Sequence, residues 1–70
     1  MTAIRSEVAG NVWKIEVSVG QQVAAGDTLL IIESMKMEIP VEAPADGKVV
    51  QIHVTEGQAI AENALVIAIE

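Results

Sequence analysis

The sequence predicts a single all-β domain, a sandwich or barrel built from short strands. Three observations support this fold class. Hydrophobic residues make up 51% of the 70 residues, and most are Val, Ile, Ala and Leu, a composition whose β-branched share favours strands. Apolar and polar residues alternate in short runs that turn signals separate. The same pattern of strands and turns occurs twice along the chain.

Size and composition limit the fold and exclude several functions. Seventy residues make one small domain, 1–70, and without cysteine it must be held by its apolar core rather than by disulfides or thiolate-bound metal. The net charge of −6 excludes a typical nucleic-acid surface, because such surfaces need clustered Lys and Arg. The apolar runs are too short to span a bilayer and no signal peptide is visible, so we expect a cytoplasmic protein without a membrane partner.

The repeat has an offset of 37 residues, the distance from Gly10 to Gly47. When these two glycines are superposed and the copies are read without gaps, Gly20 falls on Gly57. The other identical pairs are Val12/Val49, Ile15/Ile52, Val17/Val54, Gln21/Gln58, Ala24/Ala61, Ile32/Ile69 and Glu33/Glu70. We therefore predict two similar halves, about 7–33 and 42–70, that share one core and are related by an approximate internal two-fold axis.

Each half begins with an alternating segment. In the first half, four apolar residues alternate with polar ones and are predicted to face the core: Trp13, Ile15, Val17 and Val19. The second half repeats the alternation at Val50, Ile52 and Val54. A period of two is typical of a half-buried strand.

Turn signals follow at matching positions. Gly20 and Gly57 come after the alternating segments, and Gly26 and Asn63 occupy a second turn in each half. Glycine and asparagine both tolerate positive φ, so the second turn can have the same backbone conformation in both halves although the residue differs. A short strand between the two turns and a final apolar strand complete each half.

Residues 29–38 have a competing interpretation. Leu, Met, Lys and Glu are good helix formers, and Pro40 would end such a helix. The repeat favours a strand, because the matching segment 65–69 reads Leu-Val-Ile-Ala-Ile. We therefore predict strands on both sides of a hairpin tip at 34–38. Pro40 and Pro44 predict that the strand leaving the tip is an edge strand or is bent.

The predicted tip carries the strongest functional signal. Tight hairpin turns favour Gly or Asn, which adopt positive φ easily, yet this tip reads Ser-Met-Lys-Met. Unfavourable turn residues are expected where function dictates them. A lone lysine in a turn is ordinarily a solvated charge. The position of Lys36 between Met35 and Met37, at the junction of the two halves, nevertheless makes it the candidate site.

The segment 33–38, Glu-Ser-Met-Lys-Met-Glu, resembles the biotin attachment motif of biotinyl domains, whose usual form is Ala-Met-Lys-Met preceded by Glu. Ser34 replaces the commoner alanine. The resemblance extends from about Glu7 to Glu70 and includes the paired glycines. The sequence is thereby identified as a member of the biotinyl/lipoyl attachment domain family, similar to single-domain biotin/lipoyl attachment proteins and to C-terminal domains of biotin carboxyl carrier proteins.

The resemblance implies a flattened β-barrel of two four-stranded antiparallel sheets, with the modified lysine on an exposed hairpin. It implies that biotin protein ligase joins biotin to the ε-amine of Lys36, and that Met35 and Met37 help to position this lysine. The domain itself would not catalyse a reaction. Its biotin would carry a carboxyl group from a biotin carboxylase to a carboxyltransferase. The gapless repeat leaves no room for the inserted thumb loop of some members, and we expect a monomer in isolation.

Other residues are weaker candidates. Glu33, Ser34 and Glu38 would guide docking of the ligase or of another partner, although solvated strand-end acids are the alternative interpretation for the two glutamates. His53 has no neighbouring metal ligands in the pattern, so no metal site is expected. Trp13 is predicted to lie in the core or at a partly covered edge.

Three other functions compete with a biotin carrier. A lipoyl carrier would have the same fold and lysine, but lipoyl domains usually show Asp-Lys-Ala, so Met35 and Met37 favour biotin over lipoate. A protein that accepts both cofactors is the intermediate alternative. An unmodified interaction module belongs to a different class, and the intact Met-Lys-Met argues against it. A catalytic enzyme is not indicated, because the sequence contains no nucleophile–base pair and no phosphate-binding glycine loop.

Overall fold

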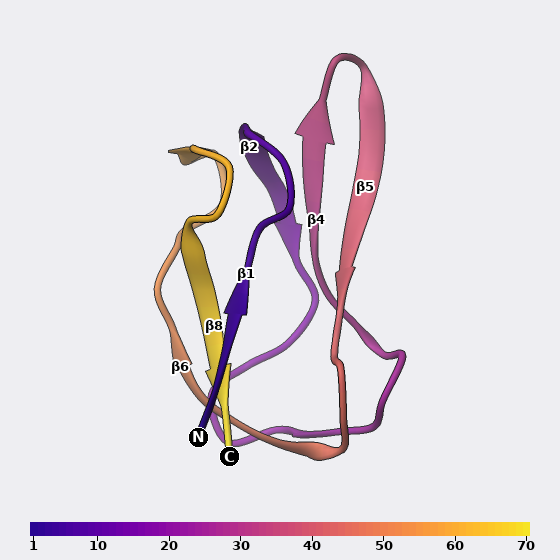
Figure 1. The fold of residues 1–70 in the computed structure, drawn as a ribbon, viewed down its shortest axis with the longest axis vertical. Helices are drawn as coiled ribbons and strands as arrows, with labels where there is room; N and C mark the ends of the chain where they lie inside the picture. Colours follow the sequence, from indigo (N-terminus) through magenta and orange to yellow (C-terminus); the bar gives the residue numbers. More distant parts are fainter.

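The computed structural model describes all 70 residues and contains eight strands and no helix. The strands are β1 (Thr2–Arg5), β2 (Gly10–Ile15), β3 (Gln22–Val23), β4 (Thr28–Ser34), β5 (Met37–Glu42), β6 (Gly47–Ile52), β7 (Ala59–Ile60) and β8 (Leu65–Ile69). They form two four-stranded antiparallel sheets in the orders β1-β8-β6-β3 and β5-β4-β2-β7 (Figure 1). The predicted fold class is confirmed, and residues 29–38 form strands and a turn rather than a helix. No helix is present that is long and apolar enough to cross a membrane.

The two sheets are copies of one another under the internal repeat. The offset carries β1 onto β5, β2 onto β6, β3 onto β7 and β4 onto β8. The turns repeat as well: the amide of Ala43 donates to the carbonyl of Asp27 at 2.8 Å, and the amide of Ser6 donates to that of Ala64 at 2.9 Å. The structural repeat thus includes β1, which has no alternating pattern and lies outside the halves that the sequence indicated.

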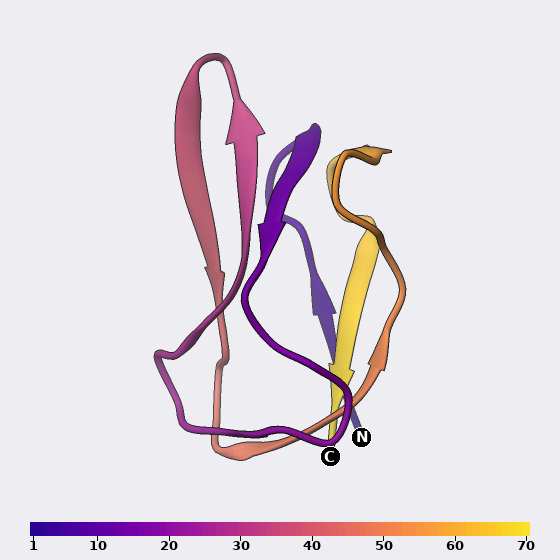
Figure 2. The ribbon, with the colours of Figure 1, turned by 180° about the vertical axis from the view of Figure 1, so that it is seen from behind.

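The connections place the tip and the termini at opposite ends of the molecule. The β4–β5 hairpin extends beyond the rest of the barrel at one end, and both termini lie together at the other end (Figures 1 and 2). Thr2 in β1 pairs with Ile69 in β8, which holds the two ends of the chain side by side. Any further chain attached to either terminus would therefore leave the domain far from the hairpin tip.

A β-bulge in β2 corrects one sequence prediction. The register with β4 shifts between Val12 and Lys14, and the register of β6 with β8 shifts at the matching position. A bulge inserts one residue and changes which side chains face inward. Val12 is therefore buried, whereas Trp13 is 49% exposed. Of the two places predicted for Trp13, the core is wrong, and the partly covered position lies on an inner strand rather than at an edge. Val19, which follows the end of β2, is 62% exposed and is also not a core residue.

The core lies between the two sheets and draws on both halves. Thirteen buried residues form it: Ile4, Val12, Val17, Val23, Leu29, Leu30, Ile32, Ala43, Val49, Val54, Val66, Ile67 and Ile69. Five pairs within this set are repeat mates, such as Leu30 with Ile67. Full burial of an aliphatic side chain contributes about 1.5–3 kcal/mol, so this cluster is the main source of stability in a chain without disulfides.

The second turn of each half has the predicted backbone conformation. The φ angles of Gly26 and Asn63 are +88° and +70°. Both residues adopt the left-handed region that glycine and asparagine tolerate best. The substitution of one for the other therefore leaves the shape of the turn unchanged.

Candidate functional site

Strands β4 and β5 hold Lys36 at the crest of a two-residue hairpin turn. Ser34, the last residue of β4, pairs with Met37, the first of β5, and only Met35 and Lys36 lie between them. The pairing continues along both strands to Thr28 and Glu42. The ladder is regular from Ser34 back to Leu30 and shifts register only between Leu30 and Thr28, so it supports the tip and fixes its direction.

The turn adopts a conformation that its residues disfavour. The φ angles of Met35 and Lys36 are +53° and +66°, the left-handed values that a two-residue turn of this kind needs at both central positions. Each costs about 1–3 kcal/mol in a residue that is not glycine. The predicted conflict between the turn and its side chains is present in the structure, and the neighbouring ladder maintains it.

Replacing Met35 with asparagine is expected to stabilise the domain. Asparagine is favoured at this turn position, so relief of the strain should contribute about 1 kcal/mol and raise the melting temperature by roughly 4–8 °C. Thermal unfolding followed by circular dichroism measures this change. Met37→Asn is the matched control: Met37 is also an exposed methionine but belongs to β5, so its replacement should bring no gain. An equal rise in both variants would contradict the strain at Met35.

The side chains at the tip project into solvent. Met35 is 93% exposed and Met37 is 64% exposed, although methionine is ordinarily a core residue. Lys36 is exposed, and no carboxylate lies within 4.0 Å of its Nζ, since the single ion pair of the structure joins Lys14 to Glu16. The amine at the crest is thus accessible and unpaired.

The other predicted residues lie directly behind the tip. Glu33 and Glu38 face each other across β4 and β5, and both are exposed. Like charges opposite one another repel, so this pair favours a cation from elsewhere. Ser34 is half-buried in the last ladder pair. His53 is exposed in the connection that follows β6. No cluster of three or more His, Cys, Asp or Glu residues could hold a metal ion.

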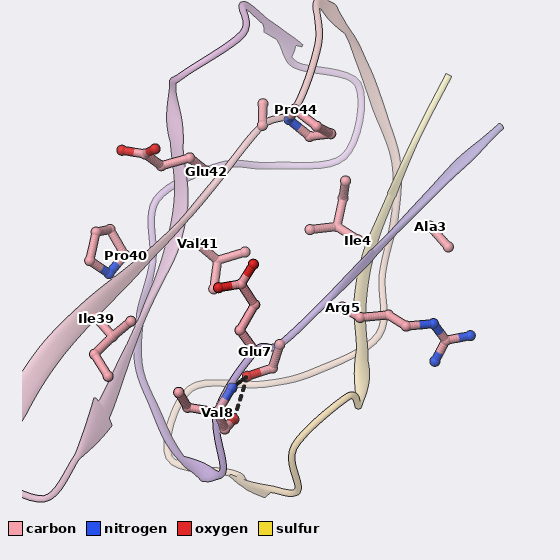
Figure 3. Close-up of a pocket in the computed structure, with 12 residues that line it drawn as sticks. Ala3, Ile4, Arg5, Glu7, Val8, Ile39, Pro40, Val41, Glu42 and Pro44 are labelled. Carbon is pink, nitrogen blue, oxygen red and sulfur yellow. Dashed lines mark hydrogen bonds between the residues drawn. The ribbon is translucent and has the colours of Figure 1, made fainter.

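The surface is also hollowed away from the tip. An open groove of about 420 Å³ lies between the edge strands β1 and β5 (Figure 3). It combines apolar side chains such as Ile4 and Val41 with the carboxylates of Glu7 and Glu42. Because β1 and β5 are repeat mates, the groove is the opening that the internal two-fold leaves between the two sheets. None of the residues of the turn contributes to it.

Comparisons with known proteins agree with this geometry. A family model described as "Biotin-requiring enzyme" matches residues 2–69. Pyruvate carboxylase of Staphylococcus aureus is 45% identical over 67 residues, which cover 96% of this chain but 6% of that protein. The biotin/lipoyl attachment protein of Bacillus subtilis is 42% identical over 57 residues, which cover 81% of this chain and 78% of that protein. The crystal structure of Kluyveromyces lactis urea carboxylase matches with a TM-score of 0.94 and 39% identity, over 99% of this chain and 6% of that one.

A two-sheet β-barrel that presents a lysine on its outermost hairpin defines the class of cofactor carrier domains. The chain belongs to the biotin/lipoyl attachment domain family, since the family model covers nearly all of it and a relative of similar length is 42% identical. The carboxylase relatives and the carboxylase structure support a biotin carboxyl carrier domain. The chain spans only a small part of the carboxylases that it matches.

Proposed function

We propose that biotin is joined as an amide to Nζ of Lys36 and that the loaded domain carries a carboxyl group within a biotin-dependent carboxylase. One observation carries this proposal: Lys36 is the lysine at the crest of the β4–β5 hairpin, whereas Lys14 and Lys48 lie within strands β2 and β6. The flanking methionines Met35 and Met37 are exposed with it, as expected of a segment that another protein contacts.

The attachment needs an enzyme, because a free carboxylate is a poor electrophile toward an amine. A biotin protein ligase activates the carboxyl group of biotin, and the nitrogen of Lys36 then bonds to the carboxyl carbon. The activating group leaves with its oxygen, and the amine loses a proton. The product is an amide, which removes one positive charge and changes the net charge from −6 to −7. An unpaired amine on a projecting turn can enter a partner's active site without disrupting the fold.

The domain then acts as a non-catalytic carrier. Biotin carboxylase and carboxyltransferase domains are the proposed partners, and biotin moves the carboxyl group between them. Tethering raises the effective concentration of biotin at each active site and replaces a bimolecular encounter by an intramolecular one. The termini lie at the end opposite the hairpin tip, so a linker there would leave the tip free to visit both sites (Figure 2).

We also propose that the isolated domain is a monomer. Strand β5 is at the edge of its sheet and contains Pro40, as predicted, and proline cannot donate a backbone hydrogen bond to a further strand. Exposed Glu38 and Glu42 on the same strand add like charges that oppose pairing of two copies. Both features are devices that protect sheet edges from edge-to-edge association.

Co-expression with a biotin protein ligase tests the proposed function. The intact mass should increase by that of one biotin less one water, and peptide mapping should place the addition on Lys36. Co-expression with a lipoate ligase is the parallel arm. A chain that remains unmodified, or that carries biotin on Lys14 or Lys48, would overturn the proposal.

Lipoate is the second candidate cofactor. The Bacillus subtilis relative bears the name of a biotin/lipoyl attachment protein, and its match covers 81% of this chain. If only the lipoate ligase modified Lys36, the domain would be a lipoyl carrier. If both ligases modified it, the domain would accept both cofactors.

A further inference from the structure

The sheet that carries the hairpin has an apolar patch on its outer face. Val12 and Ile32 face each other across β2 and β4 and are buried, so the next residues on each strand face outward. The register places Lys14 opposite Ile31 and Ile31 opposite Pro40. The bulged residue beside Lys14 is Trp13, which is 49% exposed. This outer patch consists of Trp13, Lys14, Ile31 and Pro40.

The internal repeat provides a matched face on the other sheet. The offset carries the outer patch onto Val50, Gln51, Ala68 and Ala3, which pair with one another in the same register. At these positions the other sheet has valine, glutamine and two alanines, and it forms without a large aromatic side chain. The tryptophan ring is therefore not a requirement of the scaffold. An exposed tryptophan that the fold does not need is typical of a protein contact.

The outer patch continues directly to the hairpin tip. The next outward pair along β4 and β5 is Glu33 facing Glu38, and the turn with Lys36 follows. Neither glutamate has a cation within 4.0 Å, because the single ion pair is that of Lys14 with Glu16. A complementary partner therefore has an apolar centre over Trp13 and basic groups on the side nearest the tip.

We propose that the outer patch is the docking surface of the biotin protein ligase, with Trp13 as the central contact. This inference rests on the proposed function of Lys36. An enzyme that draws Nζ of Lys36 into its active site must lie against the hairpin, and the outer patch continues the outer face of that hairpin onto the neighbouring strand β2. Because Trp13 is remote from the reacting nitrogen, it contributes to binding and leaves the chemical step unchanged.

Ligase kinetics with this chain as the varied substrate test the docking proposal. Trp13→Val introduces the residue that the repeat places at position 50, so the scaffold should tolerate it, and equal thermal unfolding curves check this. We expect the KM for the carrier to rise about tenfold with kcat unchanged, as for loss of a central aromatic contact. Trp13→Phe should restore most of the affinity. Gln51→Ala, on the matched face, should change neither constant.

The outcomes separate this inference from the proposed function. Wild-type KM in the Trp13→Val variant, on a chain that takes up biotin normally, would overturn the docking proposal alone. A wild-type chain that takes up no biotin would overturn both. Two results would assign the patch to another occupant and so also overturn the proposal. One is a wild-type dimer that the variant dissociates in sedimentation. The other is normal biotinylation followed by slow carboxylation of the loaded variant by a biotin carboxylase.

Discussion

Replacing Lys36 with arginine is expected to abolish biotin incorporation completely. Arginine keeps the positive charge and a similar length, but its guanidinium is a delocalised cation that does not act as an acylation nucleophile at neutral pH. The loss should therefore be one of chemistry alone, with the fold intact. Intact-mass spectrometry after co-expression with the ligase measures incorporation, and circular dichroism checks that the variant remains folded.

Lys14 and Lys48 provide the matched controls. Each is exposed and lies on a strand. Arginine keeps the positive charge that Lys14 contributes to the outer patch, so Lys14→Arg and Lys48→Arg should reach the same final extent of biotin incorporation as the wild type. Residual incorporation in the Lys36→Arg variant, accompanied by loss in either control, would show that the hairpin lysine is not the acceptor. All three variants carry the same Lys→Arg change, so they differ only in its position.

Replacing Gly10 with alanine is expected to cause the largest loss of stability. A Cβ atom at Gly10 would collide with the carbonyl oxygen of Glu33 and lie 2.9 Å from Cγ2 of Ile32. The carbonyl belongs to the backbone of β4, which pairs with β2 beside Gly10, so it can move only if the strands separate. Overpacking of this kind costs about 3 kcal/mol, which corresponds to a fall in melting temperature of roughly 12–24 °C.

The repeat supplies the control for this change at Gly47. There a Cβ atom would lie 2.9 Å from the carbonyl oxygen of Glu70 and 3.5 Å from the Ile69 side chain. Glu70 exchanges two backbone hydrogen bonds with Lys48, each of 2.9 Å, but it follows the end of β8, and the distance to its carbonyl oxygen is longer than at Gly10, so a smaller shift relieves the contact. Gly47→Ala should therefore lower the melting temperature by about a third as much. Equal falls in melting temperature would contradict the difference in crowding between Gly10 and Gly47.

The turn positions of the glycines and the location of Lys36 were predictable from the order of residues along the chain. The glycines at Gly20 and Gly57 identify the repeat, and the repeat places Lys36 at the junction of the halves, where the structure has the hairpin turn. The unfavourable φ values at the tip also follow from reading a tight turn without glycine. These inferences need only the order of residues and the geometry of a two-residue hairpin.

The position of Trp13 was not predictable in this way. The alternating pattern assigns it to the core together with Ile15, but the bulge at β2 shifts the alternation by one residue. A bulge is a property of two paired strands, and the period of one strand does not reveal it. The same holds for β1: Thr2–Arg5 has no alternation, and it becomes a strand because β8 lies beside it.

By itself, the amino-acid sequence determined the doubled all-β scaffold, the turn chemistry and the presence of one lysine between two methionines at its midpoint. These depend on interactions between residues near one another in the chain. Tertiary structure alone decided that Trp13 faces solvent, that Glu33 faces Glu38 and that the Gly10 backbone touches β4. Each of these depends on the register between strands, which is set by how both sheets bury a shared core.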